Sequence, residues 1–546
     1  MSGRDPLGRG IWHVSRECDG IAEAGGLKDV VAGLSVSLVR AGVPSAVVLP
    51  RYGFIDLKQI GAEPTGIRFD LYLPAADDNT PGAQTQNGGA EPVEVYHLKR
   101  DGVDVYLLDS PRTRSKRAIY TYTAEEESQD PRKRKGTGHW DAHHLNLLLQ
   151  HGALKLATIR EAPDVFHCHD GHSAFLPAIL KTSSPFREKL KHSLALITIH
   201  NAGKGYHQEI HDLELAARLT RLPTDVLSAG ILGGAVDPFL VGSVYAPINT
   251  VSEGYAGEIL SGRLEELTGG LGAALRERGI RLLGITNGIT PDSFDPRNPG
   301  ASGLPFAFDP ARDELSGKRA CRTRFLELLA AAGGDEGSGA AGVAELAGVQ
   351  IVGSLHGKVD TPLYTFVGRL TGQKGVDVLA GAVDHFIARG ADAQFLILGQ
   401  GERVIEDHLL RIVSRPQARG RLCLLIGYNS SAAKYVYGCG DFFLVPSQYE
   451  PCGLTDLFAQ MMGNLPIVHA VGGLVKVIPG VTGYSYTDHS VRSLISAIDE
   501  SLSDYADNPQ RLRQLRAQAF AEVLEHYTWE KVLRDSYLPL YRNEST

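Results

Sequence analysis

The sequence lacks any apolar run long enough to cross a bilayer, which excludes a protein anchored by membrane-spanning helices. Cysteine is scarce: there are six, without CxxC spacing or a signal-like leader, which favours a reducing compartment over a disulfide framework. Charge of one sign is not in large excess, since the net charge is −8 and the pI is about 6.2. We therefore expect neither a membrane nor a nucleic acid as partner.

Glycine, by contrast, is abundant. Its 62 residues exceed the usual share of about 7% and indicate many tight strand–helix turns, where backbone can approach a ligand closely. A chain of 546 residues with 43% hydrophobic content is too long for one typical core. We therefore expect two domains, each with its own interior.

The first motif is a strand–helix–strand unit. Residues 11–15 and 45–50 have the composition of strands, and a glycine loop at Gly25–Gly26 precedes a helix from Leu27 to Leu38. A glycine-rich turn after the first strand serves either ligand binding or close helix–sheet packing. The turn alone does not distinguish these two roles.

The next region combines alternating strands with charged segments. Three alternating segments between Phe69 and Ser110 predict a hairpin-rich insertion, broken by a polar loop at residues 75–91 that we expect to be mobile. Residues 112–135 are dense in charge of both signs. This density favours a solvated surface, and electrostatic binding of a charged or polymeric ligand is the alternative.

Polar side chains gather where predicted strands end. His167, His169, Asp170 and His172 lie within six residues, and Asn201 ends a later strand. The alternation of His167 and His169 along a strand, without a later Cys/His pair at ligand spacing, disfavours a metal site. A polar pocket rim is the favoured interpretation, because open α/β sheets bind ligands at the carboxyl ends of their strands. A metallohydrolase is only a distant alternative.

Repeated βα units dominate the second half of the chain. From Thr365 onward, short apolar strands alternate with helices, which predicts parallel sheets covered by helices on both faces. We therefore predict an α/β protein with two doubly wound domains, at residues 1–250 and 251–526. A C-terminal helix at 527–546 is expected to cross back to the first domain, and an Ala/Gly-rich stretch predicts a flexible insertion near 331–360.

The segment Gln448–Leu474 combines a carboxylate with a helix start. Glu450 lies in a predicted strand-to-helix loop, and apolar residues at helical spacing follow Gly453. The amides of Gly453, Leu454 and Thr455 are then the unpaired donors of a helix N-terminus, which suits a phosphate. This pattern predicts a site for a sugar and a phosphate.

Several motifs, in order along most of the chain, resemble those of the bacterial glycogen synthase and plant starch synthase family. These enzymes are retaining nucleotide-sugar glucosyltransferases. The motifs are EAGGLKDVVAGL (Glu23–Leu34), VVLPRY (Val47–Tyr52), FHCHDGHSAFLPA (Phe166–Ala178), TIHN (Thr198–Asn201), NTVSEGYAGEI (Asn249–Ile259), NGITPDSFDP (287–296), FVGRLTGQKGVDVL (Phe366–Leu379) and YEPCGLTDL (Tyr449–Leu457).

The resemblance implies a fold and an activity. The fold is GT-B, with two Rossmann-like domains facing a deep cleft. The activity is transfer of glucose, with retention, from a nucleotide sugar to the nonreducing end of an α-1,4-glucan, and ADP-glucose is the favoured donor. A same-fold transferase with another donor or acceptor, and a noncatalytic glucan-binding or regulatory protein, remain alternatives. We expect a cytoplasmic location, or the plastid stroma in a eukaryote.

The resemblance also implies roles for single residues. Arg369 and Lys374 would neutralise the donor diphosphate without a metal or other cofactor, and the sequence contains no Asp-x-Asp motif. Glu450 would bind glucose hydroxyls, and His172 would face the reacting carbon. The remaining implied site residues are Gly25, Gly26, Tyr428, Cys452, Gly453, Leu454 and Thr455 for the nucleotide sugar, and Asp29, Asp141 and Asn201 on the acceptor side. For Tyr428 and Cys452, packing within the loop is the alternative.

Some positions depart from the family pattern. Glu23 stands where the loop lysine is expected, which places an anion near the predicted phosphate site. Lys28, one helical turn later, is a candidate replacement for that lysine. The other departures are Gly171 for tryptophan, His469 for arginine, Val471 for threonine and Lys476 for aspartate.

Overall fold

The computed structural model describes residues 7–74, 89–332 and 344–544. The chain divides into two compact units. Unit 1 comprises Met1–Gly288 with Val532–Thr546, and unit 2 comprises Ile289–Lys531.

Unit 1 extends beyond the boundary predicted at residue 250. The strands β10 (Ile248–Thr250) and β11 (Leu282–Gly284) pair in parallel within the same sheet, which keeps the intervening chain in unit 1. The C-terminal segment returns to unit 1 at Val532, slightly later than the predicted residue 527. Both limits depend on pairing and packing partners that are distant in sequence.

Among the described residues, unit 1 contains a nine-stranded sheet in the order β11-β10-β7-β6-β1-β2-β5-β4-β3. The predicted insertion is only partly separate from it: β3 and β4 form an antiparallel hairpin, but β5 pairs in parallel with β2. Residues 75–88 of the predicted polar loop lie outside the described residues. The remaining strands are β1 (Ile11–Val14), β2 (Ser45–Pro50), β3 (Glu63–Leu73), β4 (Gly89–Arg100), β5 (Val103–Asp109), β6 (Val165–His169) and β7 (Leu194–Ile199).

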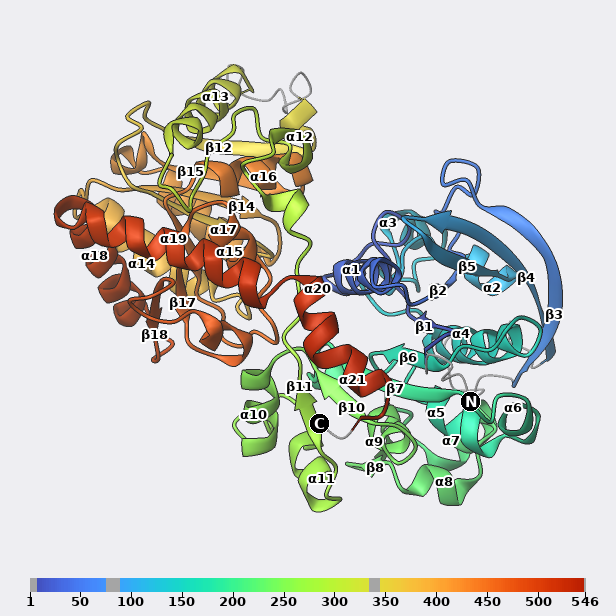
Figure 1. Ribbon diagram of the computed structural model, residues 1–546. Coiled ribbons are helices and arrows are strands. Elements are labelled where there is room, and N and C mark those ends of the chain that lie inside the picture. Colours follow the sequence, from blue (N-terminus) through green and yellow to red (C-terminus); the bar gives the residue numbers. More distant parts are fainter. Residues whose placement is uncertain (1–6, 75–88, 333–343, 545–546) are drawn as a thin grey trace. The chain divides into compact units, whose positions relative to one another are not determined.

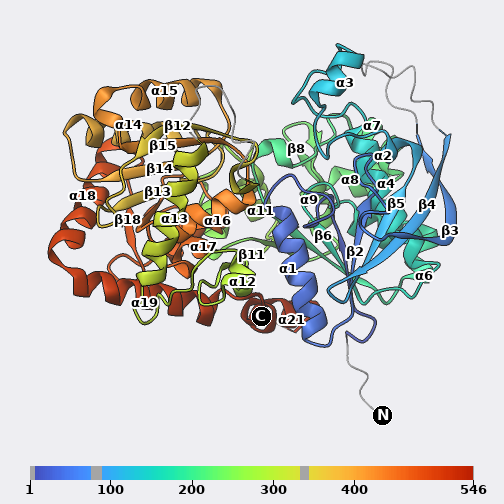
Figure 2. The same cartoon turned by 90° about the horizontal axis from the view of Figure 1, so that it is seen from above.

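Helices cover both faces of this sheet. Along β2, Ala46 and Val48 pack in the same core as α4 and α5, whereas Val47 and Leu49 pack with α1. The C-terminal segment from Val532, which ends in α21 at the dark red end of the colour bar (Figures 1 and 2), belongs to this unit, and its π-helical turn Leu533–Tyr537 contacts α1. The helices of unit 1 are α1 (Leu27–Arg40), α2 (Pro111–Arg114), α3 (Ala124–Gln129), α4 (Ala142–Ala157), α5 (Leu176–Thr182), α6 (Ser184–Lys189), α7 (Leu213–Thr220), α8 (Thr224–Ser228), α9 (Pro238–Ser243), α10 (Glu253–Ser261), α11 (Leu271–Glu277) and α21 (Leu538–Tyr541), beside the short hairpin β8–β9 (Ile231–Leu232 and Ala235–Val236).

Unit 2 contains a seven-stranded sheet among the described residues, in the order β12-β15-β14-β13-β16-β17-β18. The predicted βα alternation is confirmed from β13 to β17. The strands are β12 (Val349–Leu355), β13 (Leu363–Val367), β14 (Gln394–Gly399), β15 (Arg421–Gly427), β16 (Phe442–Val445), β17 (Leu465–His469) and β18 (Tyr484–Tyr486), and the helices are α12 (Pro299–Ser302), α13 (Ser316–Ala332), α14 (Val376–Ala388), α15 (Arg403–Val413), α16 (Ser430–Cys439), α17 (Thr455–Met461), α18 (Val491–Asp507), α19 (Pro509–His526) and α20 (Trp529–Val532).

Both faces of this second sheet are also buried. Phe395 and Ile397 of β14 pack with α14, α15 and α18, whereas Leu396 and Leu398 pack with α13 and α16. Alternate residues of a strand point to opposite faces, so continuous apolar strands require helices on both sides. Figure 1 shows the strands of this sheet enclosed between these helices.

The flexible insertion predicted near residues 331–360 needs correction. Residues 333–343 lie outside the described residues, but β12 (Val349–Leu355) is a regular edge strand that pairs antiparallel with β15. Its hydrogen-bonding partner lies about 70 residues later in the chain, so the local Ala/Gly-rich composition does not reveal it. No helix in the described parts of the chain is long and apolar enough to cross a membrane.

Each sheet contains one point where the strand order reverses direction. In unit 1 this point lies between β1 and β6, and in unit 2 it lies between β13 and β16. Loops that leave neighbouring strands on opposite sides of such a point diverge, which leaves a crevice for ligands at the carboxyl ends. The loops at these two points contain His172 in unit 1 and Arg369, Lys374 and Glu450 in unit 2, whereas Asn201 follows β7 and Tyr428 follows β15.

Candidate active site

In unit 2, the loops after β13 and β16 bring a lysine and a glutamate into direct contact. Lys374 Nζ donates to Glu450 Oε2 over 2.6 Å, and Ser447 Oγ donates to the same oxygen over 2.9 Å. Glu450 is only 7% exposed. The structure thus joins two residues that lie 76 positions apart in the sequence.

The charge state of Glu450 follows from these contacts. Burial alone would raise its pKa, but the Lys374 ammonium and the two hydrogen bonds outweigh burial and hold the pKa below its usual value. Glu450 is therefore an ionised carboxylate at neutral pH. Such a group accepts hydrogen bonds from hydroxyls strongly.

A glycine allows the two loops to meet. Gly375 has a φ of +66°, and a Cβ at this position would lie 1.8 Å from the carbonyl oxygen of Pro446, just before the β16 loop. Arg369 begins the same turn and is exposed, with one bond from Nη2 to Gln373 Oε1 at 2.9 Å. Its guanidinium is free to bind an anion in addition to this contact.

The predicted phosphate cradle is a helix start without a side-chain cap. Helix α17 begins at Thr455 with Leu454 as N-cap, a residue whose side chain makes no capping hydrogen bond. Gly453 has a φ of +74°, which glycine adopts readily. The first-turn amides therefore remain available for an anion.

Lys476, noted in the sequence only as a departure, holds this loop in place. Its buried Nζ donates to the carbonyls of Cys452 and Gly453 over 2.7 Å each, and to that of Gly473 over 2.9 Å. It also forms an ion pair with Asp456 at 3.1 Å. Burial raises the pKa of Asp456 to about 6, against the opposing effect of the Lys476 charge.

His469, another departure, supports the same loop. Its Nδ1 donates to the carbonyl oxygen of Ser447 over 2.8 Å, and Ser447 in turn donates to Glu450. In the sequence, His469 and Lys476 are recognisable only as departures from the family pattern. That departure does not reveal which residues they contact.

Tyr428 and Cys452, for which either ligand contact or loop packing was expected, differ in exposure. Tyr428, which follows β15, is 70% exposed, so its ring is not packed in the loop and stacking on a base stays a prediction. Cys452 is buried, as its packing alternative requires. A Cβ on Gly473 would lie 2.0 Å from the Cys452 carbonyl oxygen, so glycine is required for this approach.

In unit 1, His172 is buried in the loop after β6. Its ring stacks on Tyr120 with centroids 5.1 Å apart, and its Nδ1 has no hydrogen-bond partner among the described residues. Burial, with a smaller effect from the Arg16 charge, lowers the pKa of His172 far below its usual value, so the ring is neutral. Arg16, which the sequence analysis missed, is buried and lies 5.2 Å from the Tyr120 ring centroid.

The neighbouring residues explain the glycine in the histidine motif. A Cβ on Gly171 would lie 2.1 Å from the carbonyl oxygen of His207, so the backbone at His207 excludes any larger side chain such as tryptophan. Asp170 accepts a hydrogen bond from the His200 amide over 2.7 Å, and burial raises its pKa to about 7. Asn201 Oδ1 accepts from the Gly203 amide over 2.8 Å.

The other histidines form hydrogen-bonded contacts across the sheet. His169 joins His13 (3.0 Å) and His200 (2.9 Å), and His167 joins Thr198 (2.6 Å) and Tyr541 (2.8 Å). The ring nitrogens of His13, His167 and His169 lie close enough together to hold a metal. Such a metal would have to displace hydrogen bonds that already use both nitrogens of His167 and His169.

The glycine loop of unit 1 is occupied by carboxylates. Glu17 accepts hydrogen bonds from the amides of Ala24 (2.9 Å) and Gly25 (2.6 Å), so the Gly25 amide is engaged. Gly26 is the N-cap of α1, and a Cβ on it would meet nothing within 4 Å. Glu23 accepts from the Gly20 amide over 2.7 Å.

Lys28 does not replace the expected loop lysine in this structure. Its ammonium binds Asp19 (2.7 Å) and Asp29 (3.0 Å), with Glu23 at 3.8 Å. Three carboxylates therefore surround it, and Asp29, predicted on the acceptor side, is one of them. A cation so paired offers little to a phosphate.

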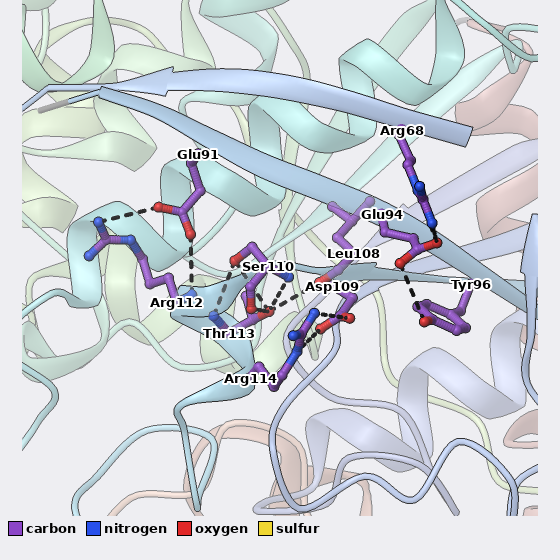
Figure 3. A network of polar contacts seen from close by, with 10 residues as sticks. All are labelled: Arg68, Glu91, Glu94, Tyr96, Leu108, Asp109, Ser110, Arg112, Thr113 and Arg114. Carbon is purple, nitrogen blue, oxygen red and sulfur yellow. Dashed lines mark hydrogen bonds and ion pairs between the residues drawn. The ribbon is translucent and has the colours of Figure 1, made fainter. Parts of the chain in front are cut away.

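Cations of the charge-dense stretch at residues 112–135 pair with carboxylates of neighbouring segments. Asp141, predicted on the acceptor side, binds Lys116 (2.7 Å) and Arg112 (3.1 Å), and these charges hold its pKa below the usual value despite burial. Figure 3 shows Arg112 beside Glu91 and Arg114 paired with Asp109. These ion pairs favour a structural role for the stretch over binding of an anionic ligand.

Comparisons with known proteins agree with these motifs. The family model of the starch synthase catalytic domain matches residues 10–277, and that of glycosyl transferases group 1 matches residues 361–504. Glycogen synthase of Exiguobacterium sibiricum is 30% identical over 97% of this chain and 98% of its own, and that of Aeromonas hydrophila is 29% identical over 93% of each.

A solved structure shares the fold. The catalytic domain of Starch Synthase IV from Arabidopsis thaliana, bound to ADP and acarbose, matches with a TM-score of 0.76 and 22% identity. The match covers 98% of this chain and 99% of that one. The predicted GT-B fold is confirmed, and with the near-full-length relatives these matches show that the chain belongs to the glycogen and starch synthase family of glycosyltransferases.

Proposed function

We propose that this protein transfers glucose from ADP-glucose to the nonreducing end of an α-1,4-glucan, with retention of anomeric configuration. The observation that carries the proposal is the ionised Glu450, held by Lys374 and Ser447 beside the uncapped first turn of α17. This arrangement offers an acceptor for sugar hydroxyls next to donors for phosphate. Family membership and the ADP present in the related starch synthase structure support the same donor.

The site residues divide the work of the reaction. Arg369, Lys374 and the amides of Gly453, Leu454 and Thr455 stabilise the departing diphosphate, which lowers the barrier to breaking the bond to glucose. Glu450 orients the glucose through its hydroxyls. A glycosidase-type carboxylate pair is unnecessary, because a nucleoside diphosphate is already a good leaving group.

His172 and Asn201 contribute from unit 1. The neutral His172 ring has an unpartnered Nδ1, which can accept a hydrogen bond from a sugar hydroxyl without adding a positive charge beside the oxocarbenium-like carbon. Asn201 is proposed on the acceptor side, together with Asp29 and Asp141. The ion pairs of both aspartates limit these two to positioning roles unless the pairs open.

We also propose that the reaction needs no metal ion. Arg369 and Lys374 supply the positive charge that a divalent cation would otherwise provide to the diphosphate. Turnover is therefore expected to be unchanged by a chelator such as EDTA. A cytoplasmic location likewise remains our prediction.

The decisive experiment incubates the purified protein with ADP-glucose or UDP-glucose, with and without glycogen. Released nucleoside diphosphate and glucan chain length are measured together. We expect turnover only when glycogen is present, with ADP-glucose preferred. Binding of nucleotide without turnover of either donor would instead favour the noncatalytic alternative, and turnover without chain extension would favour another acceptor.

A pair of lysine variants tests the site directly. Lys374→Ala removes the partner of Glu450 and is expected to lower kcat/KM at least tenfold, which is about 1.4 kcal/mol of transition-state stabilisation. Lys358→Ala is the matched control, because Lys358 is exposed and precedes β13 at the other edge of the sheet. Equal activity of the two variants would contradict the assignment.

A further inference from the structure

A polar cavity lies in unit 2 at the amino ends of β13 and β16. Its volume of about 490 Å³ is within the range of about 300–1,000 Å³ that ligand pockets occupy. Asp441, just before β16, lines it and accepts a hydrogen bond from the Leu363 amide at the start of β13 (2.9 Å). The proposed donor loops follow the carboxyl ends of these strands, so this cavity lies at the opposite edge of the sheet.

Positive charge dominates the lining of this cavity. Among the described residues, five cationic side chains face three carboxylates, although the whole chain has a net charge of −8. The cations are Lys318, Arg319 and Arg322 of α13 with Arg513 and Arg516 of α19, and the carboxylates are Asp313, Asp360 and Asp441.

Ion pairing within the cavity leaves this excess uncompensated. Asp313 is shared by two guanidinium groups, those of Arg513 (2.9 Å) and Arg516 (2.8 Å). Lys318 forms no ion pair with a carboxylate in the described chain, and its Nζ donates to the carbonyls of Met462 (2.6 Å) and Tyr437 (3.4 Å). Carbonyl dipoles solvate an ammonium only in part, so a net positive charge remains.

Two of these cations are deeply buried. The side chain of Arg322 is 3% exposed; its terminal nitrogens bind Asp441 (3.3 Å) and the Thr361 carbonyl (2.8 Å), but its Nε has no hydrogen-bond partner in the described chain. Burial lowers the pKa of Lys318 to about 8, with a smaller opposite effect from Asp441. A desolvated cation without full compensation is costly, and an anion in the cavity would relieve that cost.

The start of α13 adds to the positive potential. This helix of 17 residues begins at Ser316, which lines the cavity, and its first turn contains no acidic residue. The first-turn amides and the helix dipole favour an anion at this end. Together with the buried guanidinium of Arg322, they form one electropositive lining.

A second cavity provides a contrast. It has about 470 Å³ and lies among β3, β4, β5 and α2, where Arg68 pairs with Glu94 and Arg114 pairs with Asp109 (Figure 3). Asp70 adds a third carboxylate against these two arginines. Its charge excess is negative, so it does not predict an anion site.

We propose that the cavity between α13 and α19 binds a phosphate dianion, either as inorganic phosphate or as the phosphate group of a small phosphorylated sugar. A phosphate monoester carries about −1.5 to −2 charges at neutral pH, which matches the excess of positive charge. Guanidinium groups bind such oxygens through paired N–H donors. This site does not rest on the proposed transferase activity.

Isothermal titration calorimetry of the full chain with inorganic phosphate and with ribose 5-phosphate tests the proposal. We expect saturable binding, at least tenfold weaker in Arg319→Gln/Arg513→Gln and unchanged in Arg324→Gln. The two altered arginines are 67% and 64% exposed, so folding should persist, as a circular dichroism melt will check. Arg324 lies on the same helix, pairs with Glu327 and does not line the cavity.

Lys374→Ala separates this site from the donor loops, and it should bind phosphate as the unaltered chain does. Loss of binding in Lys374→Ala but not in Arg319→Gln/Arg513→Gln would place the anion on the donor loops and overturn the proposal. So would the absence of saturable binding below about 10 mM. Tighter binding of ribose 5-phosphate than of phosphate identifies a phosphorylated sugar as the ligand, and equal binding identifies phosphate itself.

Discussion

At the scale of single residues, the function of this protein depends on charges that the fold pairs or leaves free. Lys374 and Glu450 were predicted from motifs, and the structure brings them within 2.6 Å of each other. Arg16, His469 and Lys476 carry comparable weight in the two sites, yet each has a hydrogen-bond partner more than 20 residues away in the chain. Sequence reasoning identifies a motif residue by its neighbours in the chain and misses residues whose role comes from distant partners.

Glu450→Ala tests the role of the carboxylate. We expect kcat to fall at least tenfold, about 1.4 kcal/mol, because the variant loses the acceptor for the sugar hydroxyls and leaves Lys374 unpaired. Glu327→Ala is the control, since Glu327 is 60% exposed on α13 and is expected to leave kcat within error. A smaller loss in steady-state kinetics on ADP-glucose would count against the assigned role.

Glu23→Lys tests the most unusual position of the glycine loop. The side chain of Glu23 is about half exposed, accepts from the Gly20 amide and lies 3.8 Å from the Lys28 ammonium, which keeps Asp19 and Asp29 as partners, so the fold should tolerate the change. We expect higher activity on glycogen, because a cation then replaces an anion where the family has lysine. An unchanged or lower rate would show that glutamate belongs to a different working arrangement, and Glu23→Gln separates loss of the anion from gain of the cation.

At the scale of structural elements, one buried ion pair fixes the loop that leads into α17. Lys476 joins the carbonyls of Cys452, Gly453 and Gly473 to Asp456, which is fully buried in the first turn of the helix. The two loop segments approach closely at Gly473, because a Cβ on this residue would lie 2.0 Å from the Cys452 carbonyl oxygen. The helix start available to the phosphate is therefore positioned by tertiary contacts and not by a local cap.

Lys476→Met tests this arrangement. Removing one partner leaves the Asp456 charge and several carbonyls buried without compensation, a change that costs about 3–5 kcal/mol in other proteins. We expect a loss of that size in the free energy of unfolding from urea titration, and weaker ADP binding. Lys434→Met, on α16, is the control and should cost less than about 1 kcal/mol, because Lys434 has no charged partner among the described residues.

A second substitution distinguishes the cost of the buried Asp456 charge from the cost of the unsatisfied carbonyls. Asp456→Asn added to Lys476→Met removes the unpaired carboxylate and should restore part of the lost stability. If the double variant is no more stable than Lys476→Met, the cost lies in the unsatisfied carbonyls and not in the buried charge.

At the scale of the whole molecule, we expect a fall in pH to lower the stability of unit 1 more than that of unit 2. In unit 1, burial lowers the pKa of many histidines, so the folded unit binds fewer protons than its unfolded chain below pH 6.5. Asp170, with a pKa raised to about 7, and His207, whose pKa is raised by Asp237 against the effect of burial, oppose this trend because they stabilise the folded unit as the pH falls. The histidines with a lowered pKa outnumber them: His13, His139, His143, His144, His151, His167, His169, His172 and His200.

Differential scanning calorimetry at pH 7.5 and pH 5.5 tests this difference. Each such histidine contributes up to about 1.4 kcal/mol of lost stability per pH unit below its unfolded pKa. We expect two transitions, with the Tm of unit 1 falling more than that of unit 2 on acidification. ADP should raise the Tm of unit 2 and so identify its transition. Equal shifts of both transitions would contradict the histidine account.

The sequence by itself determined the α/β class, the alternation of strands and helices and the family, and it predicted the site residues within the family's motifs. These features are local: a period of two or 3.6 residues, a glycine turn, or a motif of about ten residues is complete within one segment. The tertiary structure alone decided the unit boundary after β11, the edge strand β12, the engagement of Lys28 by three carboxylates and the electropositive cavity between α13 and α19. Each of these joins residues far apart in the chain, and the free energy of such contacts depends on partners that sequence periodicity does not specify.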